Sequence, residues 1–139
     1  MKLLTFVEMA CCFSMTSLIW LVQLVHYPSF RYVDEQKFIP FARFHSARIS
    51  LIVTPLMFME IAASAMLFYL HKNVWSGISF GTVGLIWLAT FFLSVPNHQK
   101  LLRVGYNAEA IERLIKTNWI RTLLWSLRTA AFLYIFHHG

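Results

Sequence analysis

Three histidines and two arginines stand near the ends of long apolar stretches of this sequence, where they could bind a metal ion or an anion. His26, His45 and His98 come from three different stretches, so they suit a three-imidazole metal site or haem ligation, unless they are ordinary polar residues at helix ends. Arginine stays charged and binds carboxylates, phenolates and phosphates, which makes Arg48 and Arg121 candidates for holding an anionic ligand. These residues indicate either metal chemistry or anion binding.

Charged residues also lie deep inside the apolar stretches. Glu60 and Arg128 are expected at comparable depths, where they either form a structural ion pair or contact a substrate or a proton. Arg48, Arg121 and Arg128 together outnumber Glu8 and Glu60 in these stretches. The surplus positive charge is met either by carboxylates of the first loop or by an anionic ligand, and the sequence leaves both alternatives open.

The composition explains what kind of environment surrounds these residues. Hydrophobic residues make up 58% of the 139 positions and charged residues only 13%, whereas a soluble domain carries roughly a quarter charged residues. A lipid solvent accounts for this balance, because the outer surface can then remain apolar. The net charge of +6 does not indicate nucleic-acid binding, since the basic residues lie in short loops between the apolar stretches. The chain is expected to form one domain, residues 1–139.

Four stretches have the length of a membrane span, for which about 20 apolar residues are needed. The first carries Glu8 and has no small-residue cleavage site, so we expect a retained span and not a cleaved signal peptide. The short second connection predicts antiparallel neighbours, and short interfacial segments are expected in the longer first and third connections. The predicted fold is an all-α integral membrane protein, an up-down bundle of four transmembrane helices, over Leu3 to about Val25, Ser46 to Leu70, Val74 to Val95, and Trp119 to Phe136.

Lysine and arginine are distributed unevenly over the loops. On the side of the membrane where both termini are expected, the basic residues are Lys2 and Lys72. The positive-inside rule therefore predicts that both termini lie on the non-cytoplasmic side. The basic residues of the two longer connections, which this rule places in the cytoplasm, are Arg31, Lys37, Arg43, Lys100, Arg103, Arg113 and Lys116.

Each predicted span carries a stripe of polar residues on one helical face, and in lipid these stripes must face inward. In an up-down bundle, the ends of the first and third spans lie at the same membrane face as the starts of the second and fourth. The polar residues at that end of the bundle are expected to form a pocket open to that face. No sequence repeat is strong enough to predict a duplicated unit. The residues expected to gather at this end are His26, His45, Arg48, Asn97, His98, Asn118 and Arg121.

The C-terminal half resembles a known family. The stretches TFFLSVPNHQKL and IERLIKTNWIRTLLWSLRT resemble the small four-helix membrane proteins grouped with the fungal anthrone oxygenases, over about the last 50 residues. The resemblance implies an oxygenase that acts on an ionisable aromatic or quinone-like molecule without a tightly bound organic cofactor. The residues that carry it are Val95, Pro96, Asn97, Asn118, Trp119, Arg121 and Thr122.

Such chemistry needs a base, a cation that holds the resulting anion, and groups that orient the substrate oxygen. Imidazole titrates near neutral pH and suits the first role. The candidate base is His45 or His98. The candidate cations are Arg48 and Arg121, and the groups expected to orient the substrate oxygen are Asn97 and Asn118. Further substrate contacts are expected from Trp125, Glu60 and Arg128.

Two other classes of function compete with the enzyme. The same histidines could ligate a metal or haem in a redox protein, so the cofactor is either absent or a histidine-ligated metal or haem. Alternatively, the chain is a non-catalytic transporter or a membrane assembly partner, which could form a homodimer. The expected partners are the lipid bilayer and a hydrophobic or anionic aromatic small molecule.

Overall fold

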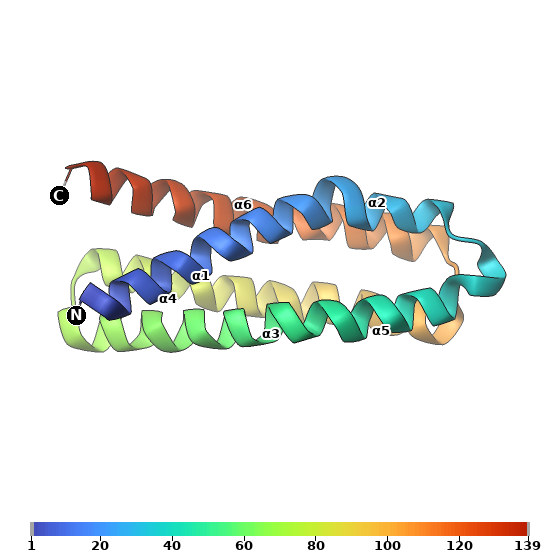
Figure 1. The fold of residues 1–139 in the computed structure, drawn as a ribbon, viewed down its shortest axis with the longest axis horizontal. Coiled ribbons are helices and arrows are strands. Elements are labelled where there is room, and N and C mark those ends of the chain that lie inside the picture. The colour runs from blue at the N-terminus through green and yellow to red at the C-terminus, as the bar shows by residue number, and fades with distance from the viewer. Residues whose placement is uncertain (1, 139) are drawn as a thin grey trace.

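The computed structural model describes residues 2–138, with side chains described to residue 135. Within this part of the chain, four long helical stretches form an up-down bundle (Figure 1). The first consists of α1 (Lys2–Leu21), the π-helical η1 (Val22–His26) and α2 (Tyr27–Ser29), and the second is α3 (Phe38–His71). The third consists of α4 (Val74–Ala89), the π-helical η4 (Thr90–Ser94) and α5 (Val95–Val104), and the fourth is α6 (Ala108–His138).

Figure 1 shows both ends of the chain at one end of the bundle and the two longer connections at the other. The connection between α3 and α4 is tight because Lys72 adopts a left-handed conformation, φ 46°, at the end of α3. Asn73 then caps α4, since its side chain accepts a hydrogen bond from the backbone N–H of Ser76 at 2.8 Å. Gly105, with φ 82°, ends α5 where a Cβ would be strained. These turns confirm the antiparallel order that the short second connection predicts.

Three helical stretches of the described chain are long and apolar enough to cross a membrane, residues 2–32, 35–71 and 74–104. Large apolar side chains on their outer faces are exposed, among them Leu24, Phe92 and Trp75. These features indicate a multi-pass membrane protein. The predicted fourth span lies in α6 and is not one of the three; it contains Arg121 and Arg128, which lower its mean hydropathy but are buried inside the bundle.

The interfacial segments differ from the prediction. The first connection contains only two short 3₁₀ turns, η2 (Phe30–Tyr32) and η3 (Glu35–Lys37), and α3 begins at Phe38, before the predicted start at Ser46. In the third connection, the predicted short helix is the first part of α6 itself. No proline or glycine interrupts the chain between Ala108 and Trp119, so the helix runs on without a break.

The first and third stretches share an unusual feature. Each contains a five-residue π-helical segment that ends two residues before a proline, Pro28 in one case and Pro96 in the other. The wide turns are closed by hydrogen bonds from the Tyr27 N–H to the Val22 carbonyl and from the Val95 N–H to the Thr90 carbonyl. Single π-helical turns are found frequently at functional sites.

The same sequence interval that separates Pro28 from Pro96 also separates Glu60 from Arg128, which pair with each other in the bundle interior. The two halves of the chain thus have the same order: a helix with a π-helical turn, a proline, and a long second helix with a charged residue at the equivalent place. The sequence pattern alone does not predict this equivalence, because few residue types coincide between the halves.

Two apolar clusters hold the bundle together and leave polar layers between them. The cluster at the end with the longer connections includes Phe30, Phe38, Leu101, Ile111 and Leu114, all fully buried. The central cluster is formed by Cys12, Met15, Ile19, Met57, Ile86 and Trp125. The candidate site lies beside the second cluster, toward the end with the longer connections.

Candidate functional site

A cavity of about 400 Å³ lies inside the bundle, between the first, second, third and fourth helical stretches. Its charged and titratable wall residues are Tyr27, His98 and Arg121, and we call it the Arg121 cavity. Most of the remaining wall is apolar, with hydroxyl groups from residues such as Thr90 and Ser94. This volume falls in the range of about 300–1,000 Å³ that is typical of small-molecule sites. The apolar lining residues include Met15, Leu18, Ile19, Val22, Val53 and Met57.

Arg121 is 5% exposed and has no ion-pair partner. Its Nη1 donates to the Ser94 hydroxyl at 3.0 Å and to the Asn118 carbonyl oxygen at 3.3 Å, and its guanidinium lies over the Trp125 ring. Among the described residues, no carboxylate lies within 4.0 Å of it, and its Nε has no hydrogen-bond partner. A buried guanidinium at the wall of an apolar cavity creates a positive potential that a ligand anion would neutralise.

A chain of amides fixes Arg121 from behind. The Asn118 amide donates to Gln23 Oε1 at 2.8 Å, and the Gln23 amide donates to the backbone carbonyl of Ile115 at 3.1 Å. Thr122 also donates to Gln23 Oε1, at 3.4 Å. Because Gln23 belongs to η1 and the others to α6, the π-helical turn of the first stretch sets the position of the arginine.

The three predicted histidines do come together, at the end of the bundle with the longer connections. His26 Nε2 bonds to His45 Nδ1, and the rings of His45 and His98 stack at 5.6 Å with an angle of 27°. His98 Nε2 lies 3.0 Å from the Tyr27 hydroxyl. His45 is buried, and its Nε2 has no partner among the described residues. Of the three histidines, only His98 lines the Arg121 cavity.

The geometry of these imidazoles is not that of a metal site. Ring nitrogens direct their lone pairs within the ring plane, so the stacked rings of His45 and His98 do not converge on one ion. In the part of the chain that the structure describes, no group of three or more His, Cys, Asp or Glu side chains is placed to hold a metal ion. The metal role of His26, His45 and His98 therefore stays a prediction.

The cavity opens on the side of the bundle. The lining residues Ser50, Thr54 and Phe58 of α3 are exposed, and so are Phe91 and Gln99 across the gap. Thr54 lies near the middle of α3 and not at one of its ends. The sequence predicts a pocket that opens at one membrane face, whereas these positions would let a ligand enter from the lipid.

Of the predicted site residues, His98 and Arg121 line the Arg121 cavity, and Arg48 and Asn97 are among those that do not. Arg48 is exposed, and its guanidinium lies 5.5 Å from the centre of the Phe44 ring on its own helix. Asn97 is buried, but its amide donates to the carbonyl of Leu93, one turn earlier. The sequence predicts Arg48 on the inner face of this helix, whereas the inner face of α3 passes through His45, Met57 and Glu60.

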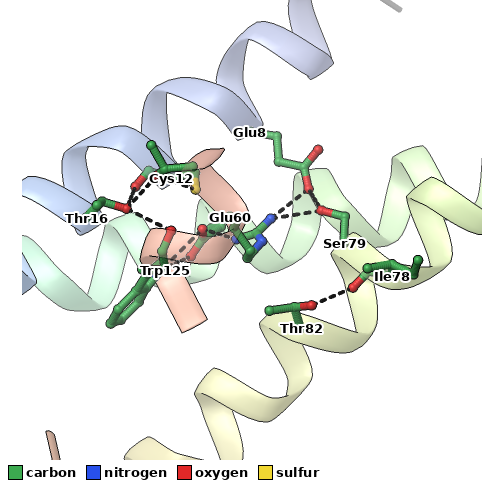
Figure 2. Close-up of polar contacts among 10 residues, drawn as sticks. Glu8, Cys12, Thr16, Glu60, Ile78, Ser79, Thr82 and Trp125 are labelled. Carbon is green, nitrogen blue, oxygen red and sulfur yellow. Dashed lines mark hydrogen bonds and ion pairs between the residues drawn. The ribbon is translucent and has the colours of Figure 1, made fainter. Parts of the chain in front are cut away.

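A second polar layer lies deeper in the bundle, and Figure 2 shows its contacts. Arg128 of α6 pairs with Glu60 of α3 through Nη1 and with Glu8 of α1 through Nη2, the latter at 2.9 Å. Ser79 of α4 donates to Glu8 Oε1 at 2.8 Å. We call Glu8, Glu60 and Arg128 the charged triad. Its members are between 1% and 4% exposed, so the predicted ion pair of Glu60 and Arg128 is present and includes a second carboxylate.

Trp125 connects the two layers. It is fully buried, its indole N–H donates to the two Glu60 oxygens at 3.1 and 3.3 Å, and its ring lies under Arg121. It does not line the Arg121 cavity, so its predicted role as a substrate contact is not supported by its position. Its place indicates that it sets the orientation of both charged groups.

A second cavity of about 500 Å³ lies at the end of the bundle where the chain termini are found. Its wall includes two members of the charged triad, Glu8 and Arg128, and the hydroxyls of Ser64 and Ser79. We call it the Arg128 cavity. The two cavities are therefore separated by the layer that contains Glu60 and Trp125.

The sequence did not single out three residues of the Arg121 cavity and its support. Tyr27 and Ser94 line the cavity, and Gln23 supports Arg121 through Asn118. Tyr27 directly precedes Pro28 and Ser94 lies two residues before Pro96, and this closeness to the prolines that accompany the π-helical turns is the signal that could have identified them.

Comparisons with protein-family models, with curated proteins and with solved structures found no match to this chain. The function is therefore argued from the site itself.

Proposed function

We propose that this protein binds an ionisable aromatic or quinone-like small molecule in the Arg121 cavity, holds its oxygen with Arg121 and removes a proton from the molecule. The observation that carries this proposal is the burial of Arg121, without a carboxylate partner among the described residues, at the wall of an otherwise apolar cavity.

The charge of the ligand follows from the cost of burying a guanidinium. An unpaired buried charge loses its hydration, and a neighbouring anion returns part of that free energy through attraction in a medium of low dielectric constant. Ser94 and Asn118 accept hydrogen bonds from only one of the guanidinium nitrogens, Nη1. The Tyr27 hydroxyl also contacts the guanidinium, and Nε has no hydrogen-bond partner among the described residues, so Nε is available to bind an oxyanion at the cavity wall.

The ligand is expected to be largely apolar because the cavity wall is apolar and the opening of the cavity faces the lipid. Methionine, leucine, isoleucine and valine side chains surround the cavity, and its exposed lining residues lie on the lipid-facing side of α3 and η4. An aromatic molecule with one ionisable oxygen would fill such a cavity and reach Arg121. A fully polar anion would leave the apolar walls without contacts.

Tyr27 and His98 are placed to handle the proton. Their 3.0 Å hydrogen bond lies at the cavity wall, so a proton taken from the ligand by His98 could be shared with the tyrosine oxygen. His45 stacks on His98 and is bonded to His26, which is only half-buried. These side chains form a row of exchangeable groups from the cavity toward the loop end of the bundle.

The resemblance to anthrone oxygenases suggests the reaction. A base removes a proton from the acidic methylene of an anthrone-like substrate, and Arg121 holds the enolate oxygen. The electron pair of the carbanion then reduces molecular oxygen, which is the second substrate. One oxygen atom becomes the new carbonyl and the other leaves as water with the two methylene hydrogens. This balance requires no bound cofactor.

The binding step is tested with lawsone, a hydroxynaphthoquinone that is anionic at neutral pH, against unsubstituted naphthoquinone. Purified full-length protein in lipid nanodiscs is titrated and tryptophan fluorescence is measured. Wild-type protein should bind lawsone more tightly, and Arg121→Gln should abolish this preference while Arg121→Lys retains part of it. The matched control is Arg48→Gln, which removes an exposed arginine and should bind like wild type.

Equal affinity of wild type and Arg121→Gln for lawsone would exclude the anion site. The reaction is tested separately, by oxygen uptake with anthrone as substrate and by metal analysis of the same sample. Oxygen uptake that is stoichiometric with quinone formation in metal-free protein supports the oxygenase. Uptake that depends on a stoichiometric metal would instead support the histidine-ligated redox protein.

A further inference from the structure

We propose that the Arg128 cavity is a second binding site, for a small organic cation with a primary ammonium group and an apolar body. The cavity has a volume of about 500 Å³, and its lining includes Glu8, Ser64, Ser79 and Arg128. The proposal rests on the surplus charge of the triad, of which Glu8 and Arg128 line the wall and Glu60 lies behind it, and on the buried Ser64 hydroxyl, which has no partner among the described residues.

The charged triad carries a surplus negative charge. When all three side chains are ionised, Glu8 and Glu60 supply two negative charges and Arg128 one positive charge. All three are almost completely buried, so water does not screen the surplus. A cation in the adjoining cavity would neutralise it, in the same way that an anion would neutralise Arg121.

One buried hydroxyl at this wall has no partner among the described residues, and one carboxylate is only partly engaged. Arg128 and Ser79 both donate to Oε1 of Glu8, so the contacts within the triad do not use Oε2 (Figure 2). The hydroxyl of Ser64 is 1% exposed, lines the cavity and has no hydrogen-bond partner within the described chain. Buried polar groups are normally hydrogen-bonded, so the Ser64 hydroxyl, next to a carboxylate in the same wall, indicates a missing donor. A primary ammonium group has three N–H donors.

The rest of the wall distinguishes an organic cation from a metal ion. Leu67, Ile78, Leu124 and Leu127 contribute apolar surface, and Trp75 contributes an aromatic ring. A metal ion would need several ligands around one point, and no such set of three His, Cys, Asp or Glu side chains is found in the described residues. An alkyl or aryl ammonium would satisfy the acceptors with its head and the apolar wall with its body.

This site is independent of the proposed function of the Arg121 cavity. The two cavities share no lining residue and take ligands of opposite charge. A failure of one proposal would therefore leave the other unaffected.

The test uses tritiated phenethylammonium and the full-length protein in nanodiscs of zwitterionic lipid, with uncharged phenethyl alcohol as competitor. Wild-type protein should bind the amine saturably, and the alcohol should compete only weakly. Glu8→Gln should weaken binding by about tenfold or more, because a charge-assisted hydrogen bond is lost. Glu109→Gln, which changes an exposed carboxylate on α6, is the matched control and should bind like wild type.

A second variant covers the case in which Glu8→Gln fails to fold. The Ser64 hydroxyl makes no hydrogen bond to the described residues, so Ser64→Ala should leave the fold intact and weaken amine binding by roughly threefold, the effect of one neutral hydrogen bond. Thermal unfolding in detergent, followed by tryptophan fluorescence, reports the integrity of each variant. The proposal is overturned if wild-type protein shows no saturable amine binding. This result is expected if one carboxylate of the triad is protonated, because the triad then has no surplus negative charge. Unchanged amine affinity in both folded variants would also overturn it.

Discussion

The Tyr27 hydroxyl lies 3.0 Å from Nε2 of His98, and this contact joins the first and third helical stretches at the wall of the Arg121 cavity. Tyr27 directly follows the π-helical turn Val22–His26, and His98 lies about one helical turn after Thr90–Ser94. The wide turns and the prolines that follow them therefore bring a phenol and an imidazole to the same place. Their closeness assigns the proton-transfer step of the proposed function to this pair.

Replacing Tyr27 by phenylalanine separates binding from proton transfer. Lawsone arrives as an anion and needs no proton transfer, so Tyr27→Phe should bind it within a few-fold of wild type. An anthrone must lose a proton, so its oxidation rate should fall by roughly 10²-fold, the lower end of the range for general acid–base catalysis. Parallel titrations and oxygen-uptake rates measure the two effects. Equal losses in both would mean that the tyrosine only supports the structure.

Arg121 should change the ionisation of a bound phenol. A guanidinium stabilises a nearby phenolate, so naphthol bound to wild-type protein should ionise at a pH lower by about one unit or more than naphthol in micelles. In Arg121→Gln the bound naphthol should ionise at a higher pH than in wild type, because burial then acts without the compensating charge. The absorbance of the naphtholate, recorded against pH, measures both values. The same ionisation pH in wild type and variant would show that the oxygen does not contact Arg121.

The charged triad should tolerate loss of a carboxylate better than loss of the arginine. Arg128→Met leaves two buried carboxylates without a cation and should lower the free energy of unfolding by about 3–5 kcal/mol. Glu8→Gln leaves the neutral pair of Glu60 and Arg128 and should cost clearly less. Thermal unfolding in detergent, followed by tryptophan fluorescence, gives the order. A variant with all three residues replaced by Gln, Gln and Met should be more stable than Arg128→Met alone, and the reverse result would contradict the argument.

The sequence predicted the bundle well because lipid imposes a simple rule on composition. Long apolar stretches separated by charged loops leave few arrangements other than an up-down helical bundle, and inward placement of Glu60, Arg121 and Arg128 follows from the cost of exposing charge to lipid. The site was predicted less well because helical periodicity was applied to stretches that are not regular helices. The π-helical turns add a residue to a turn, and this changes which side chains face inward after Val22 and Thr90.

Arg48 shows a second limit of the sequence-based prediction. An arginine near a helix end can extend its long side chain to the membrane surface, so its place in an apolar stretch does not require burial. In the structure it is exposed, whereas Arg121 is buried among Ser94, Asn118 and Trp125. The residues that distinguish the two arginines come from other helices, and a single sequence does not show which helices will be neighbours.

The ion pair of Arg31 and Glu112 should behave differently from the triad, because both side chains are more than 40% exposed. Two hydrogen bonds from Arg31, at 2.6 and 3.0 Å, hold the pKa of Glu112 below its ordinary value. A lowered pKa in the folded state stabilises the protein at neutral pH, and this contribution is lost as the pH falls through the lowered pKa. Glu112→Gln should therefore unfold at a slightly lower temperature than wild type at neutral pH.

The difference between Glu112→Gln and wild type should disappear in acid and should shrink at high salt, since solvent and ions screen an exposed pair. Thermal unfolding in detergent at neutral and at acidic pH, each at low and high salt, measures it. A difference that persists in acid would mean that Glu112 acts through packing and not through its charge.

The two cavities should be blocked independently by a bulky residue at each wall. Thr54 of α3 is exposed at the mouth of the Arg121 cavity, and Thr82 of α4 lines the Arg128 cavity, where its hydroxyl bonds only to the Ile78 carbonyl of its own helix. Neither threonine is fully buried, so phenylalanine at either position should leave the bundle folded. Thr54→Phe should reduce lawsone binding and leave phenethylammonium binding unchanged. Thr82→Phe should do the opposite.

This pair of variants also tests the direction of entry. If lawsone reaches Arg121 from the lipid between α3 and η4, Thr54→Phe should slow its association more than its dissociation, because the substitution narrows the route and leaves the Arg121 contacts in place. Stopped-flow quenching of tryptophan fluorescence in nanodiscs measures both rates. An unchanged association rate, with normal affinity, would show that the ligand enters from the loop end of the bundle, past the half-buried His26. That route would place the row of histidines in the path of the ligand as well as of the proton.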